Sequence, residues 1–108
     1  MPKDDLSGKN LDHVNLSGAN LAQKDLSRSS LRGAQLRGTN LTGANLQGSD
    51  LHGAHLEQAD VTGADLRDAD LSGASLHGVD INQAASIEGA RLDDVEGVPG
   101  AQRLPKEW

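Results

Sequence analysis

Residues 39–53 read TNLTG-ANLQG-SDLHG, three successive five-residue units with leucine at the centre of each. The same spacing extends in both directions, because an apolar residue stands at every fifth position from Leu6 to Ile81, sixteen times in succession. A small residue lies two positions before the centre in thirteen units, Asn or Asp lies directly before it in twelve, and glycine lies two positions after it in ten. The repeating unit is therefore Ala-(Asn/Asp)-Leu-x-Gly.

A period of five residues fits neither regular secondary structure. On an α-helix each leucine would lie about 140° from the last, which leaves no apolar face. On a straight strand an odd period would place successive leucines on opposite faces. The chain must therefore turn once per unit, and glycine two positions after the centre suits a type II turn, which needs φ > 0. Four such turns would close a coil of about twenty residues, with coils stacked about 4.8 Å apart, although counting alone leaves a three-sided coil open.

This motif resembles the pentapeptide repeat family, and the resemblance covers residues 4 to about 97. It implies an all-β fold, a right-handed quadrilateral β-helix of about five coils, with the central and small residues inside and the Asn/Asp and turn positions outside. The predicted structural core consists of Leu26, Leu31, Leu36, Leu41, Leu46, Leu51, Leu56, Val61, Leu66, Leu71, Leu76 and Ile81.

Residues twenty positions apart should be neighbours in adjacent coils. This predicts that Asp12 pairs with Arg32 and that Arg37 pairs with Glu57. It also places Asp50 over Asp70 and Asp60 over Asp80, where like charges should repel each other. The charge pattern therefore supports the stacking of coils only in part. Burial of the leucine column should be the largest favourable contribution to stability.

The repeat slips by one residue at Ala84-Ala85, which predicts a bulge at a corner, and then resumes. Residues 1–97 are expected to form the solenoid and residues 98–108 a C-terminal cap, because Pro99 cannot donate a strand hydrogen bond. The predicted cap residues are Val98, Leu104 and Trp108.

The N-terminal end of the solenoid carries polar residues at inward positions, Asp4, Lys9 and Lys24. These residues predict an irregular first coil and argue mildly against stacking on a second copy. The chain is expected to be either a monomer or an end-stacked homodimer.

Composition excludes several classes of function. The chain has 108 residues, so one domain is expected, and it has no Cys, Phe or Tyr. The absence of cysteine excludes disulfides, thiolate zinc sites and cysteine nucleophiles. Sixteen acidic residues against ten basic ones give a net charge of −6, which argues against direct nucleic-acid binding. No stretch is apolar enough to span a membrane, and a cytoplasmic location is the default expectation.

No catalytic, cofactor-binding or metal-binding residues are predicted, and no enzymatic activity is expected. His52 and His77 each follow a central leucine but lie five repeats apart, and His55 occupies another kind of position, which indicates tolerant surface sites rather than a cluster. The Asp65, Asp68 and Asp70 group matches neither the EF-hand spacing nor the calcium nonapeptide. A solvated surface is the simpler interpretation of these residues.

Charge is unevenly distributed along the predicted rod. Residues 21–40 carry a net charge of +3 and residues 41–83 a net charge of −6. The function expected is a non-catalytic interaction or scaffold module with an unidentified protein partner. The candidate partner surface consists of Arg28, Arg32, Arg37, Asp50, Asp60, Asp65, Asp70 and Asp80.

The alternative is a DNA-mimicking ligand of DNA gyrase or a related topoisomerase, as some members of the resembled family are. Regularly spaced carboxylates between Asp50 and Asp80 fit that role. A rod of about 24 Å is shorter than one DNA turn of about 34 Å, however, and the basic band in the second coil would interrupt the mimicry.

Overall fold

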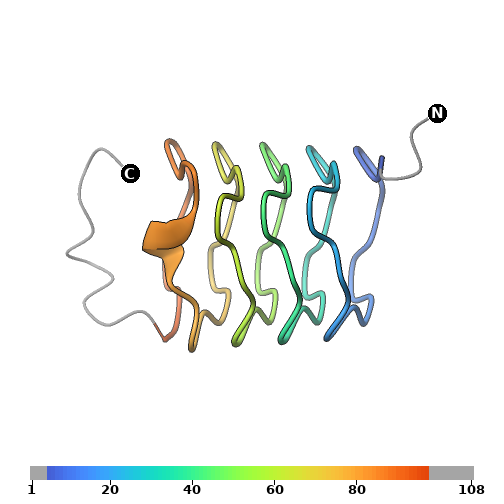
Figure 1. Cartoon of the computed structure of the whole chain (residues 1–108). Coiled ribbons are helices and arrows are strands. Elements are labelled where there is room, and N and C mark those ends of the chain that lie inside the picture. Colours follow the sequence, from blue (N-terminus) through green and yellow to red (C-terminus); the bar gives the residue numbers. More distant parts are fainter. Residues whose placement is uncertain (1–4, 98–108) are drawn as a thin grey trace.

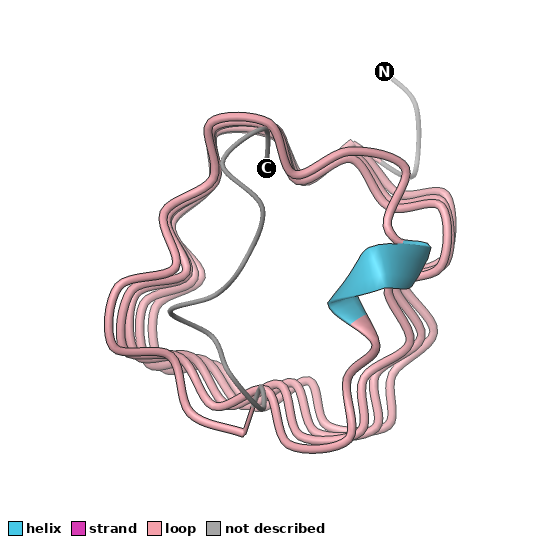
Figure 2. Cartoon of the chain, turned by 90° about the vertical axis from the view of Figure 1, so that its left-hand side faces the viewer, coloured by secondary structure: helices cyan, strands magenta, loops and turns pink. Residues whose placement is uncertain are grey.

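The computed structural model describes residues 5–97, which wind into a stack of coils (Figure 1). Parallel β-bridges join residues twenty positions apart, from Asp5 with Asp25 through to His55 with Ser75. Because each repeat has five residues, twenty residues make four sides, and the end-on view shows the coils superposed as a quadrilateral (Figure 2). This spacing excludes the three-sided coil.

The coils are held together by a repeated set of backbone hydrogen bonds. In the third coil, the Leu46 N–H donates to the Asp65 carbonyl at 2.8 Å, and the Gly48 N–H donates to the Arg67 carbonyl at 2.9 Å. The Asp65 N–H donates back to the Ala44 carbonyl at 2.9 Å. The extended part of each side is so short that the β-structure in residues 5–97 consists of isolated bridges, and the one helix there is η1 (Ile81–Gln83).

The interior is filled by the central residues and the small residues before them. The structure buries all twelve residues of the predicted core, and alanines such as Ala34 and Ala44 are buried completely. Where a hydroxyl replaces alanine, it bonds to the backbone: Ser29 and Ser49 donate to the carbonyls three residues earlier, at 2.7 and 2.8 Å. The narrow interior thus contains little besides leucine and small side chains.

Each corner of the regular repeat before η1 places its second turn residue in the left-handed region. Gly38 has φ of 64°, and the equivalent residue one coil later, Gln58, has φ of 62°. Because glycine has no Cβ, it adopts this conformation without strain, whereas glutamine does not. The turn requirement explains why glycine dominates this position.

The predicted bulge is a single turn of 3-10 helix. η1 interrupts the ladder, so that Asp60 and Asp80 form no bridge within the described residues, and the next bridge joins Asp65 to Ser86, twenty-one positions apart. The side chain of Asp80 caps η1 by accepting from the Asn82 N–H at 3.1 Å. The inserted residue is therefore absorbed at one corner, and the remaining sides keep their pairing.

The first coil is less completely covered than the second. Leu6, Leu11 and Leu16 are only partly buried, whereas Leu26 and Leu31 are 0% and 1% exposed. The predicted cap residues Val98, Leu104 and Trp108, and Asp4 at the other end, lie outside the described residues.

Candidate interaction surface

The outward side chains stack in columns, one on each side of the coil. We name each face by one member of the column that directly precedes the centres. The Asp65 face contains Asp5, Asp25, Asn45, Asp65 and Ser86; the Asp50 face contains Asn10, Ser30, Asp50, Asp70 and Arg91; the His55 face contains Asn15, Gln35, His55, Ser75 and Glu96; and the Asp60 face contains Asn20, Asn40 and Asp60.

The Asn and Asp residues of these columns support the corners that follow them. Asp50 accepts a hydrogen bond from the His52 N–H at 3.1 Å, and Asp60 accepts from the N–H and hydroxyl of Thr62 at 3.0 and 2.6 Å. Such bonds between a side chain and the backbone two residues later favour turns. They engage Oδ1 of each of these two aspartates in the turn, while Oδ2 of Asp50 faces Arg32.

The eight residues of the predicted partner surface do not come together. Arg28 and Asp65 belong to the Asp65 face or its corner, Arg37 follows the His55 face, and Asp60 lies on the Asp60 face. Asp80 precedes η1. The largest group on one face is Arg32, Asp50 and Asp70, on the Asp50 face and its corner.

On the Asp50 face, two stacked aspartates lie between two arginines. Asp50 and Asp70 are bridged neighbours, as the sequence spacing predicts. Arg32 Nη1 lies 3.8 Å from Asp50 Oδ2, and Arg91 follows Asp70 in the column. Hydrogen bonding from Ser72, together with the nearby positive charge of Arg91, lowers the pKa of Asp70. The flanking cations therefore offset the like-charge contact that the sequence alone suggested.

The predicted ion pair between Asp12 and Arg32 takes a different form. Asp12 Oδ1 accepts from the backbone N–H of Arg32 at 3.0 Å and from the Ser30 hydroxyl, while the guanidinium lies near Asp50. These hydrogen bonds, above all that from Ser30, lower the pKa of Asp12. Twenty-residue spacing placed the residues together, but backbone geometry decided which atoms meet.

The predicted pair of Arg37 and Glu57 forms, with Nε and Oε1 3.3 Å apart. His55 Nδ1 also lies 3.7 Å from Glu57 Oε2, a contact that the spacing of the repeats did not reveal because both residues belong to one unit. Partial burial opposes ionisation of Glu57, but hydrogen bonds from its own backbone N–H, Arg37 and Ser75 lower its pKa.

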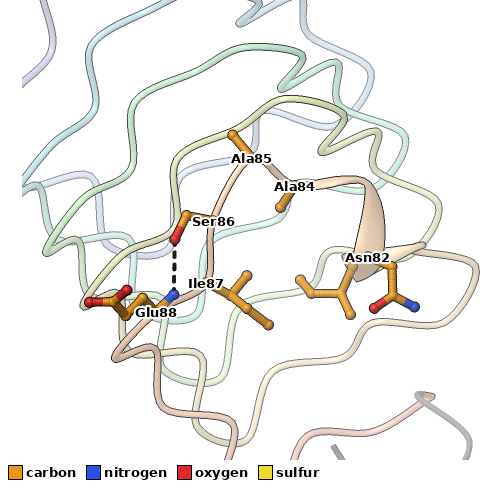
Figure 3. Close-up of a pocket in the computed structure, with 7 residues that line it drawn as sticks. Asn82, Ala84, Ala85, Ser86, Ile87 and Glu88 are labelled. Atoms are coloured by element: carbon orange, nitrogen blue, oxygen red, sulfur yellow. Dashed lines mark hydrogen bonds between the residues drawn. The ribbon is translucent and has the colours of Figure 1, made fainter. Parts of the chain in front are cut away.

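A hollow of about 240 Å³ lies beside η1 (Figure 3). Its lining consists of Ile81, Asn82, Ala84, Ala85, Ser86, Ile87 and Glu88. The Ser86 hydroxyl accepts from the Glu88 N–H at 3.2 Å, and the lining pairs no nucleophile with a base. Among the described residues, no group of three or more His, Cys, Asp or Glu side chains is placed to hold a metal ion. That part of the chain also contains no helix long and apolar enough to cross a membrane.

Comparison with known proteins identifies the family. The family model described as pentapeptide repeats matches residues 10–48 and 49–85. This chain belongs to the pentapeptide repeat family. Its fold is the right-handed quadrilateral β-helix of that family, whose members are generally structural or interaction modules rather than enzymes.

Solved pentapeptide repeat structures resemble the chain along most of its length. Rfr23 from the cyanobacterium Cyanothece 51142 is 37% identical with a TM-score of 0.69, and the match covers 85% of this chain and 58% of Rfr23. A pentapeptide repeat protein of the Arabidopsis thaliana thylakoid lumen is 33% identical with a TM-score of 0.56, over 91% of this chain and 74% of that one. HetL from Nostoc sp. strain PCC 7120, involved in heterocyst differentiation regulation, is 31% identical with a TM-score of 0.50, over 85% and 52%. No curated protein sequence matches the chain.

Proposed function

We propose that this pentapeptide repeat protein is a non-catalytic interaction module that binds a protein partner through its Asp50 face. The observation that carries the proposal is the arrangement of Asp50 and Asp70 between Arg32 and Arg91. A partner that fits would present positive charge opposite the two aspartates and negative charge opposite the arginines.

The structure of the rod supports a role for outward side chains. Most of the backbone N–H and C=O groups of the middle coils are used between coils or within turns, and the interior is filled by buried side chains. Contacts with a partner must therefore come from the outward columns and corners. Because neighbouring coils hold one another in register, a face presents its side chains at fixed spacing, which lowers the entropy cost of binding.

Site-specific cross-linking in the organism that encodes the chain would test this proposal. A photoreactive residue at Ser72, on the corner of the Asp50 face, should capture a discrete partner, whereas one at Thr62, on the corner of the Asp60 face, should not. With that partner purified, Asp50→Asn combined with Asp70→Asn should weaken binding about tenfold or more. Asparagine keeps the acceptor for the turn, so the fold is preserved.

The matched control is Asp60→Asn, which removes one carboxylate charge from a different face. It should leave the affinity within about twofold of the parent chain. Equal cross-linking from both corners, or equal affinity of the double variant and the parent, would place the contact elsewhere on the rod.

The second candidate is a DNA-mimicking ligand of DNA gyrase. Stacked Asp50 and Asp70 support it, but Asp60 and Asp65 lie on two other faces, so the carboxylates do not follow one continuous strip. A supercoiling assay with purified gyrase, with and without a quinolone, separates the two roles. Inhibition or protection at low micromolar concentration that disappears in the Asp50→Asn and Asp70→Asn variant would favour DNA mimicry.

A further inference from the structure

The residues that precede the centres direct both of their backbone polar groups toward the preceding coil. Ser30 donates its N–H to the Lys9 carbonyl at 2.8 Å and accepts from the Leu11 N–H at 2.6 Å. Gln35 and Asn40 make the same two bonds with their own preceding units. In the first coil, the equivalent N–H and C=O groups must therefore point to the outer edge of the rod.

In the first coil, the equivalent residues are Asn10, Asn15 and Asn20. Their N–H and C=O groups point away from the second coil, and within the described part of the chain neither group has a partner. Behind this edge lie Leu11 and Leu16, which are only partly buried. Within residues 5–97, the first coil is therefore a β-edge without a partner, beside leucines that are only partly buried, and such an edge favours pairing with another chain.

This edge is complementary to itself. In an antiparallel pair, two opposite residues exchange both of their N–H···O=C bonds, which requires each to present N–H and C=O on the same side. We infer that the edge of the first coil is a homodimer interface, in which two copies meet coil to coil about a two-fold axis. This inference concerns the end of the rod and does not depend on the proposed use of the Asp50 face.

Charge selects the register of this dimer. One two-fold axis opposes Asn10 to Asn10 of the partner copy, Asn20 to Asn20 of the partner copy, and Asn15 to Asp5 of the partner copy. A quarter turn away, Asp5 would face Asp5 of the partner copy, and like charges directly opposite are unfavourable. The first register therefore opposes no two charged side chains, because each Asp5 meets the neutral Asn15 of the other copy.

Lys9, which the repeat predicts to point inward, is exposed in the structure. Hydrogen bonds from Ser7 are the main cause of the lowered pKa of Asp5, and the nearby charge of Lys9 contributes to it. Because Lys9 is exposed, its ammonium group carries no burial cost at the edge of the first coil.

The last coil of the described residues is less suited to this pairing. Residues 86–97 carry four acidic side chains, Glu88, Asp93, Asp94 and Glu96, against one basic side chain, Arg91. On the Asp60 face, η1 interrupts the bridge ladder. Two such ends would bring like charges together and would pair on fewer sides than two first coils.

Cysteine cross-linking tests the interface directly, because the chain has no cysteine of its own. Residues in a hydrogen-bonded antiparallel pair have Cα atoms about 5.5 Å apart, within the range that a disulfide spans. Under mild oxidation the full-length Asn10→Cys variant should form a disulfide-linked dimer within minutes. The matched Ser30→Cys variant, one coil inward on the same face, should remain monomeric on denaturing gels.

A near-isosteric charge variant provides the second measurement. Asn10→Asp combined with Asn20→Asp keeps the acceptors of both turns but opposes like charges across the dimer. Sedimentation equilibrium should show a dissociation constant raised about tenfold, and 1 M salt should restore most of the affinity. Asn40→Asp combined with Asn45→Asp adds the same charge to the outer surface of the second and third coils, away from the interface. This control variant should leave dimerisation unchanged.

Three results would overturn the inference. The parent chain could sediment as a monomer up to about 200 µM, far above the micromolar dissociation constants of weak dimers. The Asn10→Cys and Ser30→Cys variants could cross-link equally, or an Arg91→Cys variant could cross-link in place of Asn10→Cys, which would put the interface at the opposite end.

Discussion

Arg37 Nε lies 3.3 Å from Glu57 Oε1 although twenty positions separate the two residues in the chain. The contact exists because each turn of the solenoid before η1 uses twenty residues and places a side chain beside its counterpart one coil away. In such a stack each coil contacts only its neighbours, so stability is nearly a sum of local terms and interfaces between coils. The effect of a substitution on stability should therefore depend on its coil and on whether its side chain points inward or outward.

Replacing a central leucine should be costly in the middle of the stack. Leu46 is 1% exposed, and Leu46→Ala should lower the free energy of unfolding by about 2–5 kcal/mol, because it removes buried surface and leaves a cavity. Urea denaturation followed by circular dichroism measures this change. Leu6→Ala, in the partly exposed first coil, should cost clearly less; an equal loss would contradict the assigned burial.

Removing glycine from a corner should destabilise the fold, and introducing glycine at the equivalent corner one coil later should stabilise it. Gly38→Ala should lower the free energy of unfolding by about 1–2 kcal/mol, because φ is 64° and a methyl group would meet open space, which leaves backbone strain as the cause. Gln58→Gly, one coil later in the same column, should raise it by up to about 1 kcal/mol. Thermal unfolding of both variants tests this, and a neutral Gly38→Ala would argue against the turn conformation.

Acid should destabilise the corners. Hydrogen bonds from the Thr62 hydroxyl and N–H lower the pKa of Asp60, so the folded state favours the ionised carboxylate. The resulting stabilisation is fully present above the unfolded pKa of about 3.9 and is lost as the pH falls through the lower folded value. The free energy of unfolding, measured from pH 6 to pH 2, should therefore fall below about pH 4.

Asp60→Asn is the control for this prediction. It keeps a side-chain acceptor for Thr62 but has no carboxyl group to protonate, so its free energy of unfolding should fall less steeply in acid. If the parent and the variant had identical pH profiles, Asp60 would have no part in the acid dependence.

Reversing two surface charges should leave the solenoid folded. Arg32 and Arg37 are more than half exposed, and ion pairs of this kind contribute about 0–1 kcal/mol each. The chain with Arg32→Glu and Arg37→Glu should therefore keep the circular dichroism spectrum of the parent at 25 °C. Unfolding of that variant near room temperature would show that the arginines support the fold, and Arg37→Gln would isolate the contribution of one pair.

The sequence predicted the positions of the inward residues but not every contact between outward ones. Leu46 and Ala44 are buried because the period of five returns each unit to the same orientation, and that period is visible in the sequence. Arg32 approaches Asp50 rather than the Asp12 carboxylate because the latter accepts from the Ser30 hydroxyl and the Arg32 N–H. Spacing of twenty residues could not distinguish a guanidinium contact from a backbone contact.

The sequence by itself determined the repeat, the inward columns, the turn at every fifth residue and the point where the register slips, because each follows from local periodicity and from the conformations that glycine allows. Only the tertiary structure decided that the inserted residue forms η1, that Asp50 and Asp70 lie between Arg32 and Arg91, and that the first coil presents backbone N–H and C=O groups with no partner among the described residues. These features depend on how one coil lies against the next. The physical reason is that hydrogen bonds and ion pairs between coils require atomic positions in two segments at once, which no single segment encodes.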